Sequence, residues 1–167
     1  MTYFFDAKIN ADSFIHFSEF CNTCDTPFTM YFSSEGGWED MIPVFLDLFD
    51  REGDRISLKG FSALYSAGFE IFFRANVAEK TILPHALGMY HGAKSSLTYH
   101  ESGYLSDISE VKKMNNIKNC SKKATELLIK KLPLNSDQRS TILGGGDVYF
   151  DYNEMCKLLK GYDKKPI

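Results

Sequence analysis

The amino-acid sequence predicts a single α/β domain with a largely parallel sheet. Short apolar runs of strand length alternate with segments whose apolar residues recur at helical spacing. Glycine, proline and small polar residues separate these segments. Such alternation is typical of βαβ units, in which a helix connects two neighbouring parallel strands.

The composition is that of a packed globular domain. The 167 residues are 44% hydrophobic and 14% aromatic, which argues against a disordered chain and suits one domain over residues 1–167. The net charge of −3 argues against nucleic acid as the main partner. No apolar run reaches the roughly 18 residues of a transmembrane helix, and residues 1–10 are too short and too acidic for a signal peptide. We therefore expect no membrane partner and a cytoplasmic location.

The first half of the chain supplies most of the expected sheet. Strands are expected at residues 2–9, 28–33, 55–58, 80–83 and 86–91. Helices are expected between them, at residues 13–24, 38–51 and 66–73. The first helix carries Phe14, Phe17 and Phe20 on one side, and Asp12 or Ser13 is expected to cap it.

The second half is predicted to be mainly helical. Helices are expected at residues 104–131, 135–143 and 152–159, and a short strand at 148–150. Pro133 ends the long helix, and Asp151 caps the last one. The apolar stripe of the long helix consists of Leu105, Ile108, Val111, Met114, Ile117, Ala124 and Leu127 or Leu128. Because this stripe exceeds what a small sheet can cover, we expect homo-oligomerisation through the helix.

Two of the four cysteines, Cys21 and Cys24, form a C-x-x-C spacing that also occurs in zinc and redox sites. No second C-x-x-C or C-x-x-H follows to complete a zinc site. We therefore expect reduced thiols, packed or half-exposed, and neither a metal nor a cofactor.

Three stretches carry the residue types of a serine hydrolase. A Gly-Gly turn at residues 33–37 can present backbone N–H groups, and Ser66 begins an expected helix that follows a small-residue turn. His91 stands at the end of an expected strand. These are an oxyanion donor, a nucleophile and a general base. The small residues near Ser66 also suit close packing of a helix on a sheet. The other histidines of the chain are His16, His85 and His100.

From about residue 4 to residue 159 the chain resembles the proteolytic subunit of the Clp protease, within the crotonase-like superfamily. The family's Gly-Gly turn, serine and histidine occur here in the same order, with 29 positions from Gly37 to Ser66 and 25 from Ser66 to His91. The phrase Leu-Pro-x-x-x-x-Met-x-His, which ends at His91, is the most specific local match. The resemblance implies an α/β crotonase-like fold of repeated ββα units, with the long helix as a projecting handle.

The resemblance also implies an activity. Ser66 is then the nucleophile of a serine-type peptidase, His91 is the base, and Gly37 and Ala67 donate the oxyanion-hole N–H groups. The implied substrates are peptides or unfolded proteins. The implied homo-oligomer is a ring of about seven subunits.

The third catalytic residue implied by the resemblance is Asp147, which orients His91. It lies 56 positions after His91, somewhat more than in the family. Gly146 stands where an arginine commonly precedes the aspartate. Asp107 and Asp151 are alternatives, although Asp151 is equally explained as a helix cap.

Other segments depart from the family's pattern. Residues 65–69 replace a stretch usually built on Ala-Ser-Met-Gly, and residues 92–102 lack the family's glycine-rich strand. The chain begins almost at its first strand, so docking to a Clp-type AAA+ unfoldase is doubtful. Two further hypotheses stay open: a catalytically inactive scaffold or regulatory subunit of a Clp-like ring, and, ranked last, an acyl-CoA-binding enzyme of the crotonase type.

Overall fold

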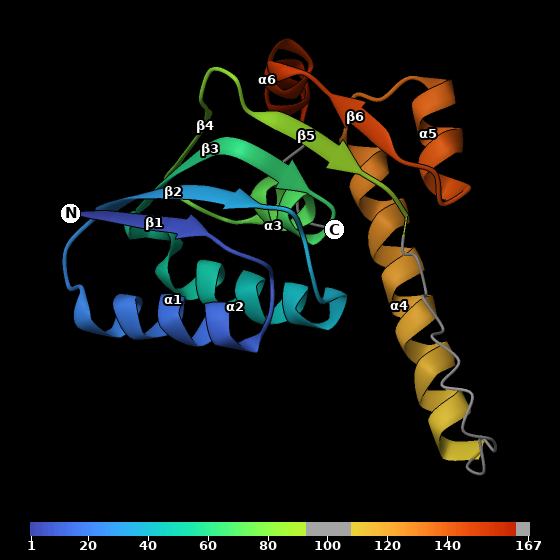
Figure 1. Ribbon diagram of the computed structural model, residues 1–167, viewed down its shortest axis with the longest axis horizontal. Coiled ribbons are helices and arrows are strands. Elements are labelled where there is room, and N and C mark those ends of the chain that lie inside the picture. The colour runs from blue at the N-terminus through green and yellow to red at the C-terminus, as the bar shows by residue number, and fades with distance from the viewer. Residues whose placement is uncertain (93–107, 163–167) are drawn as a thin grey trace.

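The computed structural model describes residues 1–92 and 108–162, and for residues 108–118 and 121 it describes the backbone alone. The described residues form a mixed α/β structure built on a six-stranded sheet with the order β1-β2-β3-β5-β6, and β4 also pairs with β3 (Figure 1). The strands are β1 (Thr2–Asp6), β2 (Phe28–Ser34), β3 (Ile56–Tyr65), β4 (Glu79–Ile82), β5 (Leu87–Tyr90) and β6 (Val148–Phe150). All pairings are parallel except that of β6 with β5, which is antiparallel.

The helices of the first half connect the parallel strands. They are α1 (Ala11–Thr23), α2 (Ile42–Glu52) and α3 (Ala67–Arg74), with short 3-10 helices η1 (Glu39–Met41) and η2 (Gly53–Arg55) around α2. The order strand, helix, strand, helix, strand, helix, strand confirms the alternation predicted from the sequence. Figure 1 shows α1 and α2 side by side along the same face of the sheet.

The second half contains α4 (Ile108–Lys131), α5 (Ser136–Leu143) and α6 (Tyr152–Gly161). Figure 1 shows α4 extending well beyond the sheet, while α5, β6 and α6 return to it. Residues 104–107 of the expected helix, with Leu105, lie outside the described residues, as do the stripe side chains before residue 119. Of the rest of the stripe, Leu128 is buried, and Ala124 and Leu127 are half-buried.

The core between the sheet and helices α1 and α2 is largely aromatic. Phe5 of β1 stacks on Phe32 of β2 at 5.0 Å between ring centroids, and its ring meets the edge of Phe45 in α2 at 5.7 Å. Phe17 of α1 lies between Phe45 and Phe49 of α2. Since burying one phenylalanine contributes about 1.5–3 kcal/mol, this cluster holds the first βαβ unit together.

Strand β3 is longer than the expected strand at residues 55–58, because it changes partner along its length. Residues 57–60 pair with β4, and residues 63–65 pair with β5. Between the two stretches the register with β2 shifts, and Ser62 has a left-handed φ of 54°. Small residues that suggested a turn therefore form a bulge, which carries β3 on to Ser66.

Of the two helix caps predicted at an N-terminus, one differs from expectation and one agrees. The N-cap of α1 is Asn10 rather than Asp12 or Ser13, and Ser13 instead completes the capping box from its third position. Asp151 caps α6, as predicted.

Candidate active site

Ser66 stands at the sharp turn between β3 and α3. It is the N-cap residue of α3, with φ 53° and ψ −120°, and its N–H donates a 2.8 Å hydrogen bond to Met89 O of β5. A non-glycine residue in such a conformation costs about 1–3 kcal/mol and persists only where surrounding contacts enforce it. A strained strand-to-helix turn is one way in which proteins expose a nucleophilic serine hydroxyl.

The turn at residues 33–37 lies directly against this serine. A Cβ placed on Gly36 would be 2.8 Å from Ser66 Cβ and 3.3 Å from Ser66 Oγ, so only glycine permits the approach. Gly36 has a φ of +99°, and its N–H is held by Ser34 Oγ at 3.1 Å. The turn and the serine, 29 positions apart in the sequence, therefore form one local structure.

Two backbone N–H groups near Ser66 have no hydrogen-bond acceptor among the described residues. One belongs to Gly37, since the bridge to Ile9 uses Gly36 O and the Trp38 N–H instead. The other belongs to Ala67, the first residue of α3, where a helix leaves its N–H groups unpaired. The partial positive charge of a helix N-terminus favours a developing negative charge there.

His91 directly follows β5, the strand that pairs with the end of β3. Both Ser66 and His91 thus stand just beyond the carboxyl ends of neighbouring parallel strands, where α/β proteins commonly place their sites. His91 Nδ1 lies 2.8 Å from Gly92 O. Because a carbonyl can only accept, Nδ1 carries the proton, and Nε2 of the neutral ring is left as an acceptor.

Within the part of the chain that the structure describes, no hydrogen bond joins Ser66 Oγ to the His91 ring. Such catalytic hydrogen bonds are often long in a site without substrate and tighten only in the complex. The structure therefore brings the two residues to the same edge of the sheet without linking them directly.

Asp147 stands at the register position opposite His91. The antiparallel pairs Met89 with Tyr149 and Tyr90 with Val148 place these two residues one step further along. The paired positions themselves end at Tyr90 and Val148. Asp147 is exposed.

The alternatives to Asp147 are differently placed. The Asp151 carboxylate accepts the Glu154 N–H at 2.8 Å as the cap of α6. Asp107 lies outside the described residues.

The small residues of the serine segment also have a packing role. A Cβ on Gly68 would lie 2.8 Å from Ser34 Cβ, and one on Gly60 would lie 2.7 Å from Leu64 Cδ1. Close packing of α3 on the sheet and exposure of Ser66 are therefore achieved by the same short segment.

Sequence reasoning missed two buried polar residues behind the site, Glu70 of α3 and Tyr90 of β5. The Tyr90 hydroxyl donates to Glu70 Oε2 at 3.1 Å. A signal for Glu70 was present, because it is the one acidic residue in the apolar segment 67–73. Its partner, 20 positions away, carried no such signal.

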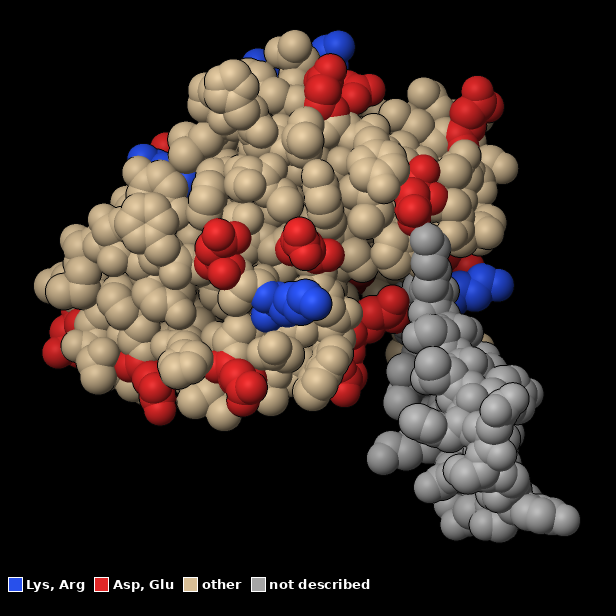
Figure 2. All heavy atoms as spheres, in the orientation of Figure 1, with Lys and Arg blue, Asp and Glu red and all other residues tan. Residues whose placement is uncertain are grey.

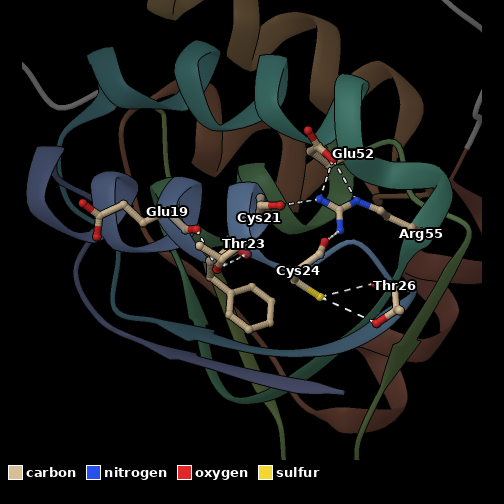
Figure 3. Close-up of polar contacts among 8 residues, drawn as sticks. Glu19, Cys21, Thr23, Cys24, Thr26, Glu52 and Arg55 are labelled. Atoms are coloured by element: carbon tan, nitrogen blue, oxygen red, sulfur yellow. Dashed lines mark hydrogen bonds and ion pairs between the residues drawn. The ribbon is translucent and has the colours of Figure 1, made fainter.

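The C-x-x-C cysteines form a separate, structural arrangement (Figure 3). Cys21 and Cys24 are free and buried, and the Arg55 guanidinium donates to both of their carbonyl oxygens. Burial raises the pKa of the Cys21 thiol to about 11, so it stays protonated at neutral pH. Among the described residues, no group of three or more His, Cys, Asp or Glu side chains is arranged to hold a metal.

The face of the molecule drawn in Figure 2 gives little sign of a polyanion-binding patch. Figure 2 shows Asp and Glu spread over the visible described surface and Lys and Arg at only a few places, without a continuous basic patch there. Of the described helices, none combines the length and the apolar character needed to cross a membrane.

Comparison with known proteins identifies the fold. No protein-family model and no curated protein sequence matches the chain. A solved structure of a ClpP1 point mutant from Listeria monocytogenes is similar with a TM-score of 0.65 and 18% identity, over 92% of this chain and 84% of that one. A peptidase from Plasmodium falciparum is similar with a TM-score of 0.66 and 14% identity, over 97% and 93% of the two chains. The chain therefore has the fold of the Clp protease proteolytic subunit.

Proposed function

We propose that the chain is a serine-type peptidase with the chemistry of the Clp proteolytic subunit. The observation that carries the proposal is the strained turn at Ser66, with the Gly36 backbone packed against its side chain. Similarity in fold to a solved peptidase supports the same reaction class. The proposed substrates are peptides or unfolded proteins.

In the proposed mechanism Ser66 Oγ attacks the peptide carbonyl, and His91 Nε2 accepts the hydroxyl proton and then gives it to the leaving amine. Water hydrolyses the resulting acyl-enzyme with His91 again as base. The N–H groups of Gly37 and Ala67 stabilise the negative oxygen of each tetrahedral intermediate. The contact between His91 Nδ1 and Gly92 O supports this role, since it keeps Nε2 available as an acceptor.

Asp147 is proposed to assist His91. Its register position opposite His91 supports this assignment over Asp151, whose carboxylate caps a helix. In this role the carboxylate stabilises the imidazolium that forms during the reaction. Gly92 O already orients the His91 ring through Nδ1. The proposed contribution of Asp147 is therefore charge stabilisation and not orientation.

A fluorophosphonate probe tests the nucleophile. We expect intact-mass analysis to find one adduct on the wild-type chain and none on Ser66→Ala. Ser62→Ala is the matched control, because Ser62 lies four positions earlier, is exposed and also has a positive φ. Label that persists in Ser66→Ala, or is lost in Ser62→Ala, contradicts the assignment.

The second candidate is a catalytically inactive scaffold or regulatory subunit of a Clp-like ring. One observation favours it: Ser66 Oγ and the His91 ring share no hydrogen bond within the described residues. A wild-type chain that takes no fluorophosphonate label but co-assembles with an active Clp-type subunit is the result this candidate expects.

Homo-oligomerisation through α4 is proposed for either candidate, with α4 as a projecting handle. The support is the apolar stripe of the sequence and the extension of α4 beyond the sheet in Figure 1. Light scattering is expected to give a mass above the 19.0 kDa of one chain. Val111→Asp, on the stripe, is expected to lower that mass by introducing an unpaired charge. Asn119→Asp, at an exposed position of the same helix, is expected to leave it unchanged. A wild-type mass of one chain at all concentrations contradicts this proposal.

A further inference from the structure

Behind the candidate site lies a small polar cluster inside an apolar region. Glu70 is only 5% exposed and Tyr90 only 2%. The Tyr90 hydroxyl lies 3.1 Å from Glu70 Oε2 and 3.4 Å from Thr125 Oγ1 of α4, and Arg74 forms an ion pair with the other oxygen of Glu70. The ring of Tyr90 stacks on Phe69 at 5.1 Å.

The chemistry of the side chains determines which is the hydrogen-bond donor and which is the acceptor. A tyrosine hydroxyl has one proton, and an ionised carboxylate is a stronger acceptor than the threonine hydroxyl. Burial first, and then the charge of Glu70, raise the pKa of Tyr90 well above its ordinary value. Tyr90 therefore stays neutral and donates to Glu70.

The cluster is connected to both proposed catalytic residues through the backbone. Glu70 N–H donates to Ser66 O at 3.1 Å, one helical turn away, and Tyr90 immediately precedes His91. On the other side, Ser66 N–H donates to Met89 O, the residue before Tyr90. Beyond the β3–β5 ladder, which ends at Tyr65 and Met89, the turn of Ser66 is thus joined to the strand of His91 by a backbone hydrogen bond and by the side-chain contacts of α3 with Tyr90, of which that of Glu70 is a hydrogen bond.

We propose that Glu70 and Tyr90 are positioning residues, whose hydrogen bond fixes the distance between the Ser66 turn and the strand end that carries His91. This inference rests on the proposed peptidase function. Neither side chain touches substrate in this role. They act by holding α3 and β5 at a separation at which His91 can reach the serine proton.

The alternative explanation, a bond that serves stability alone, accounts poorly for these residue types. Phenylalanine at position 90 would keep the stack on Phe69, and an apolar side chain at position 70 would need no compensation for a buried charge. Replacing a buried polar pair by apolar groups of similar shape is often neutral or stabilising. The pair therefore offers little for stability that apolar residues would not.

The test compares three variants by the rate of fluorophosphonate labelling, by kcat and KM on an activated ester, and by thermal midpoint. Tyr90→Phe and the double variant Glu70→Met with Tyr90→Phe are expected to label about 10-fold more slowly, with kcat reduced and KM within about 2-fold. Glu70→Gln keeps an oxygen acceptor for Tyr90, so its labelling rate is expected to lie between those of the double variant and the wild type. Tyr3→Phe is the matched control: it removes the hydroxyl of a half-buried tyrosine whose ring packs on α1, far from Ser66 along the chain.

The outcomes separate this inference from the function on which it rests. Wild-type labelling rates in Tyr90→Phe and the double variant overturn the inference and leave the peptidase assignment intact. A slower rate that merely follows a lower thermal midpoint, with Glu70→Gln no better than the double variant, also overturns it. A wild-type chain that does not label overturns both. If Tyr90→Phe does not fold, the labelling rate of Glu70→Gln is compared with that of the wild type, and equal rates overturn the inference.

Discussion

The backbone strain at Ser66 predicts that Ser66→Gly makes the chain more stable while it abolishes the proposed chemistry. With φ 53° and ψ −120°, Ser66 costs about 1–3 kcal/mol relative to a relaxed residue. Glycine adopts such a backbone freely but loses about 0.5–1 kcal/mol more conformational entropy on folding. The net gain is about 1 kcal/mol, which in a domain of this size raises the thermal midpoint by about 2–4 °C.

The matched variant is Ser66→Ala, which removes the same hydroxyl but keeps a Cβ and therefore the strain. Its unfolding free energy is expected to stay within about 0.5 kcal/mol of the wild type. Ser62→Gly provides a second comparison, since Ser62 has nearly the same φ, 54°, at an exposed position. It is expected to gain stability similarly but to keep fluorophosphonate labelling.

Urea unfolding followed by tryptophan fluorescence and circular dichroism measures these differences directly. The reasoning is refuted if Ser66→Gly is no more stable than Ser66→Ala, because the turn would then hold no strain that glycine relieves. It is also refuted if Ser66→Gly still accepts the probe.

Three further predictions follow from single contacts. Gly36→Ala adds a Cβ 2.8 Å from Ser66 Cβ at a φ of +99°, so we expect a loss of about 2–4 kcal/mol in stability and of all labelling; an active, stable variant contradicts the geometry. Asp147→Asn is expected to slow labelling about 10-fold, because Gly92 O already holds the His91 ring. Loss of a carboxylate that alone orients the histidine would cost roughly 10⁴-fold. Asp151→Asn is expected to have no effect on labelling, because asparagine can still cap α6. A maleimide at pH 7.5 is expected to modify the exposed Cys120 and spare Cys21, because burial keeps the Cys21 thiol protonated. The Cys21 thiolate forms only as the pH approaches its pKa of about 11. Equal rates of modification at the two cysteines would contradict this prediction.

The order of elements was predictable because each depends on local pattern. Strand runs, helical spacing and the Asp151 cap are properties of neighbouring residues, and the structure contains them. The length of β3 was not predictable in the same way. Its residues 59–65 contain small side chains typical of a turn, and pairing with residues distant in the sequence, in β2, β4 and β5, holds them extended.

The N-terminal cap of α1 illustrates a second limit of local pattern. Asn10, Asp12 and Ser13 are all good capping residues, so propensity alone does not rank them. A capping box needs a partner at the third helical position, and Ser13 supplies it only if Asn10 is the cap. Here the geometry of the pair, rather than either residue, decides where the helix begins.

The candidate site was likewise predictable only in part. Gly37, Ser66 and His91 were selected as candidates because their order and spacing match the pattern of the Clp proteolytic subunit, which the chain resembles. The contact of Gly36 with Ser66, the hold of Gly92 O on His91 and the pairing of Glu70 with Tyr90 are tertiary contacts. No pattern in a single sequence predicts these contacts.

The strain at Ser66 also bears on the choice between a peptidase and an inactive scaffold. Whole domains are stable by only about 5–15 kcal/mol, so about 1–3 kcal/mol in one residue is a sizeable fraction. A scaffold gains nothing from this conformation, and glycine at position 66 would remove the strain without altering the packing of α3. A peptidase needs both the hydroxyl and the turn that exposes it, and departures from local preference are expected where function requires them. The same argument applies to the carboxylate of Glu70, which an apolar residue could replace in a structural core but not in a hydrogen bond to Tyr90. Two departures of this kind on either side of one helical turn favour chemistry at that turn over a purely structural role.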